Sequence, residues 1–559
     1  MKRTLPLIAA VILAAPVFAQ KKPAEPELPK LVENIDVRVI NVDVVVTDKR
    51  GNPVPGLKKE DFEIYENNVP KVITNFYEVS GSEQKGAIAD EVGGRVTAPE
   101  RKDAVPEEMK RRIIFYVDNL SLSPFNRNRV FKQMKDFCDS IMRPGDEAMI
   151  ATYNRSMKVR VPFTRDSSQI KSMLDALSSE SGQGIANNSE RKSVEDRIRD
   201  ASSYEDALAT ARMYASSVEH DLRQSVASIN ALMSTLAGVE GKKVLVLTSE
   251  GFPIQPGREM FMFIDEIGKE KGWSNVGSSM LEGMTYDGSN LIQSVAKTAN
   301  ANGITLYAIH AAGLNTVANE MSAEYSRPTP QNVAHISSTN STESMQLMAD
   351  MTGGIASVNT NNFNLAFQRI QKDLESYYSL GYRAGTERVD RQRYLNVKVK
   401  NKDYRVRARQ TFVEKSVFAE MSDRVIANLL YRTKHNDLGI LGRVGSPIPT
   451  EDGYFRVPVD VQIPMESLTL LPQGEAEYVG GFDVYVVVGN KDNDMSDVAR
   501  KSHQIRVPAA DIKKINGKFY TYSLELICER GLNKISIGVV DQVSSVSGFA
   551  REQIIAQNQ

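Results

Sequence analysis

"IIFYVDNLSLSP", residues 113–124, runs from an unbroken apolar stretch into Asp118, Ser121 and Ser123 and ends on a proline. A continuous apolar run of this length is typical of a strand buried on both faces, and residues 126–142 that follow repeat apolar side chains at helical spacing. A buried strand followed by a helix is the repeating unit of parallel sheets. The polar residues between them therefore mark a candidate site at the end of a strand.

Two interpretations of these polar residues remain open. In the first, their oxygen atoms hold a metal ion, because hard divalent cations prefer carboxylate and hydroxyl ligands. In the second, Asp118 caps the helix that follows, Ser121 and Ser123 satisfy the free backbone N–H groups before Pro124, and Glu250 further along is a solvated loop residue.

The alternation of strand and helix patterns continues for about 260 residues. After 113–120, the predicted strands are 147–154, 158–164, 242–251, 304–311, 354–358 and 377–384. Between them the predicted helices are 167–177, a long stretch ending near 236, 289–302, 342–351 and 362–376, with a polar insertion at 178–200. Strands that are apolar throughout and alternate with helices indicate a doubly wound, Rossmann-like α/β domain with a parallel sheet covered on both faces.

The flanking segments have the two-residue periodicity of β-strands that are exposed on one face. We therefore predict a multidomain α/β plus β chain, in which N- and C-terminal β-sandwich-like domains flank the α/β domain. In order, the predicted parts are a signal peptide (1–19), a linker (20–34), a small N-terminal β domain (35–80), a second linker (81–110), the α/β domain (111–385), a β-hairpin extension (386–414), a connecting helix (415–435) and a C-terminal β-sandwich domain (436–559).

The first residues predict export. Lys2 and Arg3 precede a short, proline-interrupted apolar run, which ends in small residues at Ala19, as in a secretory signal. No later stretch is apolar for the roughly 18 residues that a membrane span requires. We expect a periplasmic or secreted product with no transmembrane segment in the mature chain.

Charge and cysteine content exclude several classes of protein. The 69 basic and 70 acidic residues nearly balance, so no global field attracts nucleic acid. The two cysteines, Cys138 and Cys528, lie in a helical and a strand-like stretch far apart in sequence. We predict two separate buried thiols, which leaves neither a disulfide scaffold nor a cysteine-bound zinc site.

Several motifs together resemble the bacterial, acidobacterial-type family of von Willebrand factor type A-related proteins. The matching segments are "VVVTDKRGNPVPGLKKEDFEIYEN" (44–67), "DNLSLSP" (118–124), "SEGFP" (249–253), "TGG" (352–354) and "YYSLGY" (377–382). The resemblance covers nearly the whole chain. It implies an interaction or adhesion function, with a divalent cation at the carboxyl end of the sheet whose coordination is completed by a carboxylate of a protein partner.

Carried over to this sequence, the resemblance implies metal ligands at Asp118, Ser121, Ser123 and Glu250, for Mg²⁺ or another divalent cation. The pattern departs from the family, because Asp118 and the two serines form DxxSxS rather than DxSxS, and Glu250 stands where the family has an aspartate. The family's threonine ligand has no assigned position, since neither Thr210 nor Ser225 is favoured. The site is thus a degenerate form of the family's metal-ion-dependent site.

Three functions follow from these features. The first is an exported, non-enzymatic protein that binds a protein partner at the strand-end face. The second is a metal-free structural or scaffold component of the cell envelope. The third, a hydrolase, is disfavoured because no nucleophile, base and orienting group can be assembled from the sequence. His310, in an apolar strand, is predicted to be a satisfied core residue, and the Met-rich segments around Trp273 are predicted to pack over the sheet.

Overall fold

The computed structural model describes residues 39–80, 83–88, 110–275, 277–314, 329–383, 389–433 and 435–557. The predicted signal peptide (1–19) and first linker (20–34) lie outside these residues. The predicted second linker (81–110) is described only at 83–88 and 110, and there it contains β5 (Glu83–Ile88), which pairs antiparallel with β4 (Ile73–Ser80). The chain divides into two compact units, one of Val37–Ser234 with Glu240–Glu414 and one of Lys415–Gln559 with Thr235–Val239.

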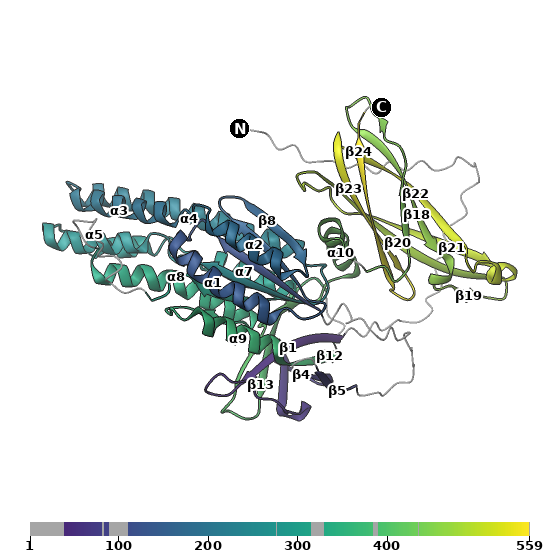
Figure 1. The fold of residues 1–559 in the computed structure, drawn as a ribbon, viewed down its shortest axis with the longest axis horizontal. Coiled ribbons are helices and arrows are strands. Elements are labelled where there is room, and N and C mark those ends of the chain that lie inside the picture. Colours follow the sequence, from purple (N-terminus) through teal and green to yellow (C-terminus); the bar gives the residue numbers. More distant parts are fainter. Residues whose placement is uncertain are drawn as a thin grey trace. The chain divides into compact units, whose positions relative to one another are not determined.

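The first unit is built on a central sheet whose six described strands have the order β11-β10-β9-β6-β7-β8. Its strands are β6 (Arg111–Asp118), β7 (Glu147–Tyr153), β8 (Met157–Thr164), β9 (Lys242–Ser249), β10 (Ile304–His310) and β11 (Ala356–Ser357). All neighbouring strands pair in parallel except β7 and β8, which are antiparallel. From β6 the chain adds β7 and β8 on one side of the sheet, and then β9, β10 and β11 on the other. The boundary between β6 and β9 is therefore the switch point of a doubly wound fold. The predicted α/β class with a central, mostly parallel sheet is confirmed (Figure 1).

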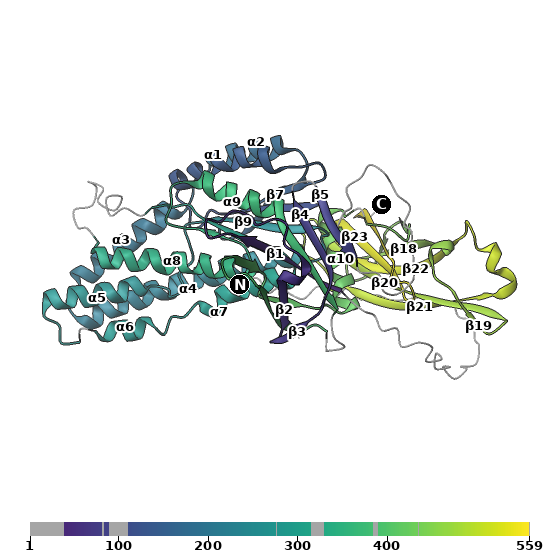
Figure 2. The same ribbon diagram turned by 90° about the horizontal axis from the view of Figure 1, so that it is seen from below.

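Helices cover both faces of this sheet. They are α1 (Pro124–Ile141), α2 (Ser167–Ser178), α3 (Gly184–Asp200), α4 (Tyr204–Thr235), α5 (Arg258–Lys271), α6 (Ser278–Gly283), α7 (Ser289–Ala301), α8 (Gln331–Thr352) and α9 (Phe363–Glu375). Because successive strand residues point to opposite faces, Phe115 and Val117 pack on α1, α2 and α9, whereas Tyr116 faces α4 and hydrogen-bonds Ser228 there. Figure 2 shows α4, α7 and α8 on the face opposite α1, α2 and α9.

A second apolar core is formed by helices alone. It joins α3, α5, the first half of α4 and the start of α8, through buried residues such as Ile198, Leu208, Phe261 and Val333. These helices extend away from the sheet in Figures 1 and 2. The predicted polar insertion at 178–200 thus contains α3, whose Val194 and Ile198 are buried in this core, whereas Ile185 is exposed. Met260 of the Met-rich segment is buried in the same core and Trp273 packs against it. The prediction that this segment packs over the sheet is corrected, because it packs against helices and Met284 is exposed.

The remaining strands of the first unit form two sheets around one core. One sheet has the order β14-β1-β12-β4-β5 and the other β15-β13-β2-β3. Their bounds are β1 (Val39–Thr47), β2 (Phe62–Glu66), β3 (Val69–Lys71), β12 (Ser376–Arg383), β13 (Gln392–Val399), β14 (Arg405–Ala408) and β15 (Thr411–Val413). The boundaries drawn from sequence at 80 and 386 are corrected here. β1 pairs with both β12 and β14, and β2 pairs with β13, so the described segments 39–80, 376–383 and 389–413 share one core.

The predicted hairpin around Asn401–Asp403 is also corrected, because β13 and β14 lie in different sheets. The physical reason is burial. A two-stranded hairpin buries too little apolar surface to be stable alone, whereas splitting the strands lets both cover the core that contains Val42, Ile64 and Leu380.

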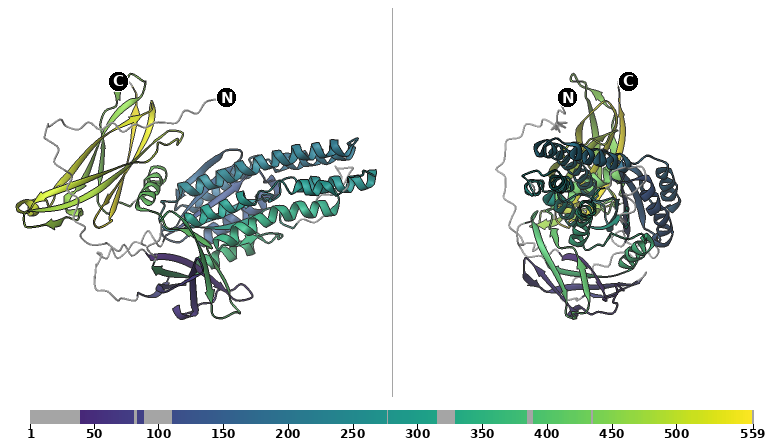
Figure 3. Two further views of the ribbon diagram at one scale, coloured as in Figure 1. Left: turned by 180° about the vertical axis from the view of Figure 1, so that it is seen from behind. Right: turned by 90° about the vertical axis from the view of Figure 1, so that its left-hand side faces the viewer.

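The second unit contains helix α10 (Val417–Tyr431) and antiparallel strands, which are the yellow-green arrows of Figure 3. One sheet joins β16 (Leu441–Val444), β17 (Ile448–Pro449), β18 (Phe455–Pro464) and β22 (Phe519–Cys528). The other joins β19 (Leu471–Gln473), β20 (Glu477–Asn490), β21 (Ala499–Pro508), β23 (Gly531–Asp541) and β24 (Ser547–Ala556). Both sheets contribute to one apolar core, and α10 packs against β20, β23 and β24.

Two further predictions concern the whole chain. Cys138 and Cys528 are both free and buried, which confirms the prediction of separate thiols. Among the described residues, no helix is both long and apolar enough to cross a membrane.

Candidate functional site

Three neighbouring strands of the central sheet end in polar residues. Asp118 is the last residue of β6, Ser249 the last of β9 and His310 the last of β10. The parallel register places Val117 beside Thr248 and Ser249 beside His310, so the three polar residues share one edge. The carboxyl edge near the switch point is where doubly wound sheets bind ligands.

Asp118 is buried and only half of its carboxylate is hydrogen-bonded. Its Oδ2 atom accepts hydrogen bonds from the hydroxyl groups of Ser121 (2.7 Å) and Ser249 (2.8 Å). Its Oδ1 atom is shielded from water and has no hydrogen-bond partner in the described part of the chain. Burial raises the pKa of this carboxyl group above its usual value, while the serine hydrogen bonds oppose that shift.

The two serines that donate hydrogen bonds to Asp118 also accept hydrogen bonds from the main chain. Ser121 Oγ accepts a hydrogen bond from the backbone N–H of Glu250 (3.0 Å), and Ser249 Oγ accepts one from the backbone N–H of Gly251 (3.0 Å). Each hydroxyl thus donates its proton to Asp118 and accepts from the chain after β9. The result is a closed network that joins the ends of β6 and β9.

Glu250 caps helix α1 from another part of the chain. Its Oε1 atom accepts hydrogen bonds from the backbone N–H of Ser123 (2.8 Å), the hydroxyl of Ser123 (2.6 Å) and the amide of Asn126 (3.1 Å). Ser123 is the N-cap residue but its own side chain makes no capping bond. A carboxylate at a helix N-terminus is stabilised by the free N–H groups and the helix dipole. The capping interpretation is therefore corrected in its assignment: Glu250 supplies the cap, and Asp118 does not.

His310 is buried at the end of β10, 2% exposed, but it is not fully satisfied. Its Nδ1 atom is buried and has no hydrogen-bond partner among the residues that the structure describes. Burial lowers the pKa of the ring to about 4, and a hydrogen bond to the main chain of Glu250 opposes that shift. His310 was predicted to be a satisfied core residue, and the structure corrects this for one of its two nitrogens.

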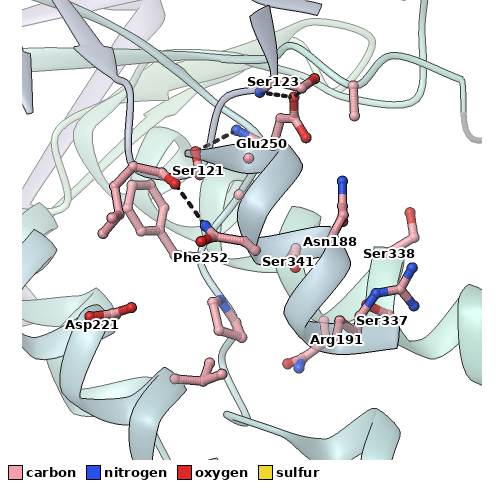
Figure 4. Close-up of a pocket in the computed structure, with 18 of the residues that line it drawn as sticks. Ser121, Ser123, Asn188, Arg191, Asp221, Glu250, Phe252, Ser337, Ser338 and Ser341 are labelled. Atoms are coloured by element: carbon pink, nitrogen blue, oxygen red, sulfur yellow. Dashed lines mark hydrogen bonds between the residues drawn. The ribbon is translucent and has the colours of Figure 1, made fainter. Parts of the chain in front are cut away.

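These residues lie at the end of a polar pocket of about 660 Å³. Asp118, Ser121, Ser123, Glu250 and His310 line it, together with side chains of α3, α4 and α8. Figure 4 shows several of the latter around the opening: Asn188, Arg191, Asp221, Ser337 and Ser338. Because α3 and the first half of α4 rise beyond the sheet, the strand-end site is a walled pocket.

The structure brings all four predicted metal ligands together, but as hydrogen-bonded pairs. Asp118 is bonded to Ser121, and Glu250 to Ser123. The hydroxyls and the bonded carboxylate oxygens are already engaged, so a divalent cation would have to break this network to coordinate them. Among the described residues, no group of three or more His, Cys, Asp or Glu side chains is placed to hold a metal ion. The residues present therefore do not fit the cation that the resemblance implies.

Sequence reasoning missed Ser249 and assigned His310 a core role. Each follows an apolar run directly, in "VLVLTS" and "LYAIH", so the signal was a polar residue closing a buried strand. The two positions considered for the family's threonine ligand, Thr210 and Ser225, have different surroundings in the structure. Ser225 is buried and lines the pocket, whereas the hydroxyl of Thr210 donates to the backbone of Asp206.

Comparison with known proteins finds no matching family model and no matching curated protein. Solved structures are similar over part of the chain. BatB from Bacteroides thetaiotaomicron is 11% identical, with 48% of this chain and 100% of that chain covered and a TM-score of 0.22. The manganese-loaded TRAP protein of Plasmodium vivax is 11% identical, with 54% and 94% covered and a TM-score of 0.23.

A third similar structure is proximal thread matrix protein 1 from the mussel byssus, with a zinc-occupied MIDAS motif. It is 13% identical, with 51% of this chain and 50% of that chain covered and a TM-score of 0.21. Similarity at this level carries no conclusion about the function of this chain.

Proposed function

We propose that this chain is an exported, non-enzymatic interaction protein, in which a von Willebrand A-type domain is accompanied by β-sandwich modules and binds a protein partner through the strand-end pocket. One observation carries the proposal. A polar pocket of about 660 Å³ lies at the carboxyl ends of the parallel strands, and two buried polar atoms of residues that line it, Asp118 Oδ1 and His310 Nδ1, have no hydrogen-bond partner among the described residues. Buried polar groups without partners are uncommon in folded proteins, and each of them calls for an explanation.

The same geometry favours binding over catalysis. A serine nucleophile needs a base that accepts its proton. The hydroxyls of Ser121 and Ser249 donate to Asp118, and His310 Nδ1 is bonded to neither. The described residues of the pocket thus lack the serine–histidine pair of a hydrolase. No divalent cation takes part in the proposal, because the predicted ligands do not fit one.

The test is capture of a partner from an envelope extract by the immobilised full chain. Asp118→Asn keeps the shape of the side chain but removes its charge. Asp136→Asn, on the exposed face of α1, is the matched control. We expect equal capture by wild type and Asp136→Asn, and a loss of at least roughly tenfold with Asp118→Asn.

Equal capture by all three proteins would contradict the proposal. It would place the contacts outside the pocket, as in the alternative of a structural component of the envelope.

A further inference from the structure

Strand β22 lies at one edge of its sheet in the second unit. It pairs with β18 along its whole length, from Phe519 opposite Pro464 to Cys528 opposite Phe455. In the described part of the chain, no strand pairs with its other side. The backbone N–H and C=O groups on that side therefore have no strand partner, and such a row of groups can bind another strand.

Two other long edge strands of this chain carry residues that prevent such pairing, namely charged residues and prolines. They are Arg500, Lys501, Arg506 and Pro508 in β21 and Lys158, Arg160 and Pro162 in β8. Strand β22 has a single charged residue, Glu525, and no proline. Its edge is therefore open to a further strand, whereas the edges at β21 and β8 are protected.

An apolar groove lies beside the open edge. A pocket of about 130 Å³ lies between β22 and β21, which are edge strands of the two sheets of this unit. Its lining residues are mostly apolar: Val484, Val486, Ala499, Tyr522, Leu524 and Leu526, with Arg500 and Lys501 from β21. A strand added to β22 therefore finds apolar surface for the side chains on its inner face.

The sequence of β22 is complementary to itself in the antiparallel direction. When Ser523 lies on a two-fold axis, opposite the same residue of a second copy, the remaining residues meet in unlike pairs. These pairs are Phe519–Ile527, Tyr520–Leu526, Thr521–Glu525 and Tyr522–Leu524. Aromatic residues opposite aliphatic ones stabilise antiparallel pairs, and no like charges lie opposite each other in this register.

The outer face of β22 presents no obstacle to this register. Thr521 and Ser523 are exposed, and the Ser523 hydroxyl donates to Asp460 of β18 at 2.6 Å. Glu525 has Arg456 of β18 as a neighbour at 3.8 Å. Phe519 is 49% exposed, and pairing with a second copy would cover it.

We propose that two copies of this chain associate through β22, as antiparallel edge strands around a two-fold axis at Ser523, so that one sheet of each copy continues into the other. The charges of β21 leave the second sheet of each copy out of this contact. A contact of this symmetry closes on itself and stops at a dimer. It is independent of the proposed function, because it uses neither the strand-end pocket nor any residue of the first unit.

The test is sedimentation equilibrium of the full chain at concentrations up to about 100 µM. Three variants each add one lysine at an exposed position of an edge strand: Ser523→Lys, Thr521→Lys and Ser502→Lys. Ser502, on β21, is the matched control, because it lies opposite Asp483 as Ser523 lies opposite Asp460. Far-UV circular dichroism checks that each variant is folded.

We expect wild type to form a dimer whose dissociation constant rises at least roughly fivefold in Ser523→Lys, because two positive charges then lie opposite each other on the axis. Thr521→Lys places each new charge opposite Glu525 of the other copy, so the dimer should be at least about twofold tighter. Ser502→Lys should leave the dissociation constant unchanged. The two changes in β22 thus have opposite effects although they lie two residues apart. If Ser523→Lys fails to fold, the comparison of Thr521→Lys with Ser502→Lys still tests the register.

A wild type that stays monomeric up to about 100 µM would overturn the inference, as would association beyond a dimer. Equal dissociation constants for wild type and Ser523→Lys would overturn it too. A dimer that Thr521→Lys does not tighten would overturn the register at Ser523. If wild type is monomeric and Ser523→Lys alone loses capture of a partner from an envelope extract, the edge binds a strand of another protein and the inference is again overturned.

Discussion

Asp118 in the first unit and Asp541 in the second both end a buried strand, and both are almost inaccessible to water, at 2% and 1% exposed. Asp541 uses both carboxylate oxygens: Oδ1 accepts from the backbone N–H groups of Val543 and Ser544, and Oδ2 from that of Thr469. Asp118 uses one oxygen and leaves the other without a partner. The same feature, an aspartate at the end of an apolar strand, therefore stabilises a turn in one unit and leaves a buried carboxylate oxygen without a hydrogen-bond partner among the described residues in the other.

The largest expected effect tests the structural half of this comparison. Asp541→Ala leaves three backbone N–H groups without their acceptor, so we expect the free energy of unfolding of its unit to fall by about 4 kcal/mol. Asp118→Ala loses two hydroxyl hydrogen bonds but also removes a poorly compensated buried charge, so we expect a loss of about 1 kcal/mol. Urea unfolding followed by circular dichroism measures both, with Asp136→Ala as the control. Equal losses at the two positions would break the comparison.

The next prediction concerns the pH dependence of stability that the buried ring of His310 causes. Burial lowers the pKa of His310 from 6.5 to about 4 in the folded chain, so below pH 6.5 the unfolded chain binds the proton more readily. The stability that the neutral ring contributes is complete above pH 6.5 and is lost as the pH falls through about 4, which amounts to about 3 kcal/mol. His310→Gln should be free of this loss, so unfolding of the two proteins at pH 7 and pH 4 measures it.

Asp118 changes the pH dependence of stability in the opposite direction from His310. Because burial raises its pKa in the folded state, its charged form destabilises the fold at neutral pH, and protonation at lower pH relieves that cost. Asp118→Asn should therefore gain less stability on acidification than wild type. For His310, the free energy of unfolding of wild type and of His310→Gln is compared at pH 7 and pH 4. If the difference between the two proteins is the same at both pH values, the burial of the neutral ring is contradicted.

A smaller effect concerns the cap of α1. Glu250→Ala removes the carboxylate from three donors at the helix N-terminus, and we expect a loss of about 2 kcal/mol. Glu250→Gln keeps an acceptor oxygen without the charge, so about 1 kcal/mol should be lost. Thermal and urea unfolding distinguish the two variants. A stability unchanged in Glu250→Ala would mean that Glu250 does not cap this helix.

The smallest expected effect is that of metal ions. Because the serine and carboxylate groups are engaged with one another, we expect the same thermal unfolding curve of the full chain with Mg²⁺, with Mn²⁺ and with chelator. A stabilising shift with either metal would show that the network at Asp118 opens to bind a cation, and Asp118→Ala should then abolish the shift. That outcome would restore the metal site implied by the sequence resemblance.

Much of the first unit could be predicted from local patterns. Apolar runs such as 113–117 and 244–247 mark strands that are buried on both faces, and the intervening helical periodicity implies parallel pairing. The shared edge of Asp118 and Glu250 followed from that topology. The pairing of β1 with β12 and β14 could not be predicted, because strand partners more than 300 residues apart are chosen by the core they share, and local alternation only says which face is apolar.

By itself, the sequence determined most strands and helices of the central sheet and that two thiols remain separate, because these depend on the order of apolar and polar side chains along a short stretch. Only the tertiary structure decided what those closing residues do. Glu250 became a helix cap because the end of β9 lies beside the start of α1. Within the described part of the chain, Asp118 Oδ1 and His310 Nδ1 have no hydrogen-bond partner, because burial removes water and the neighbouring side chains bond elsewhere.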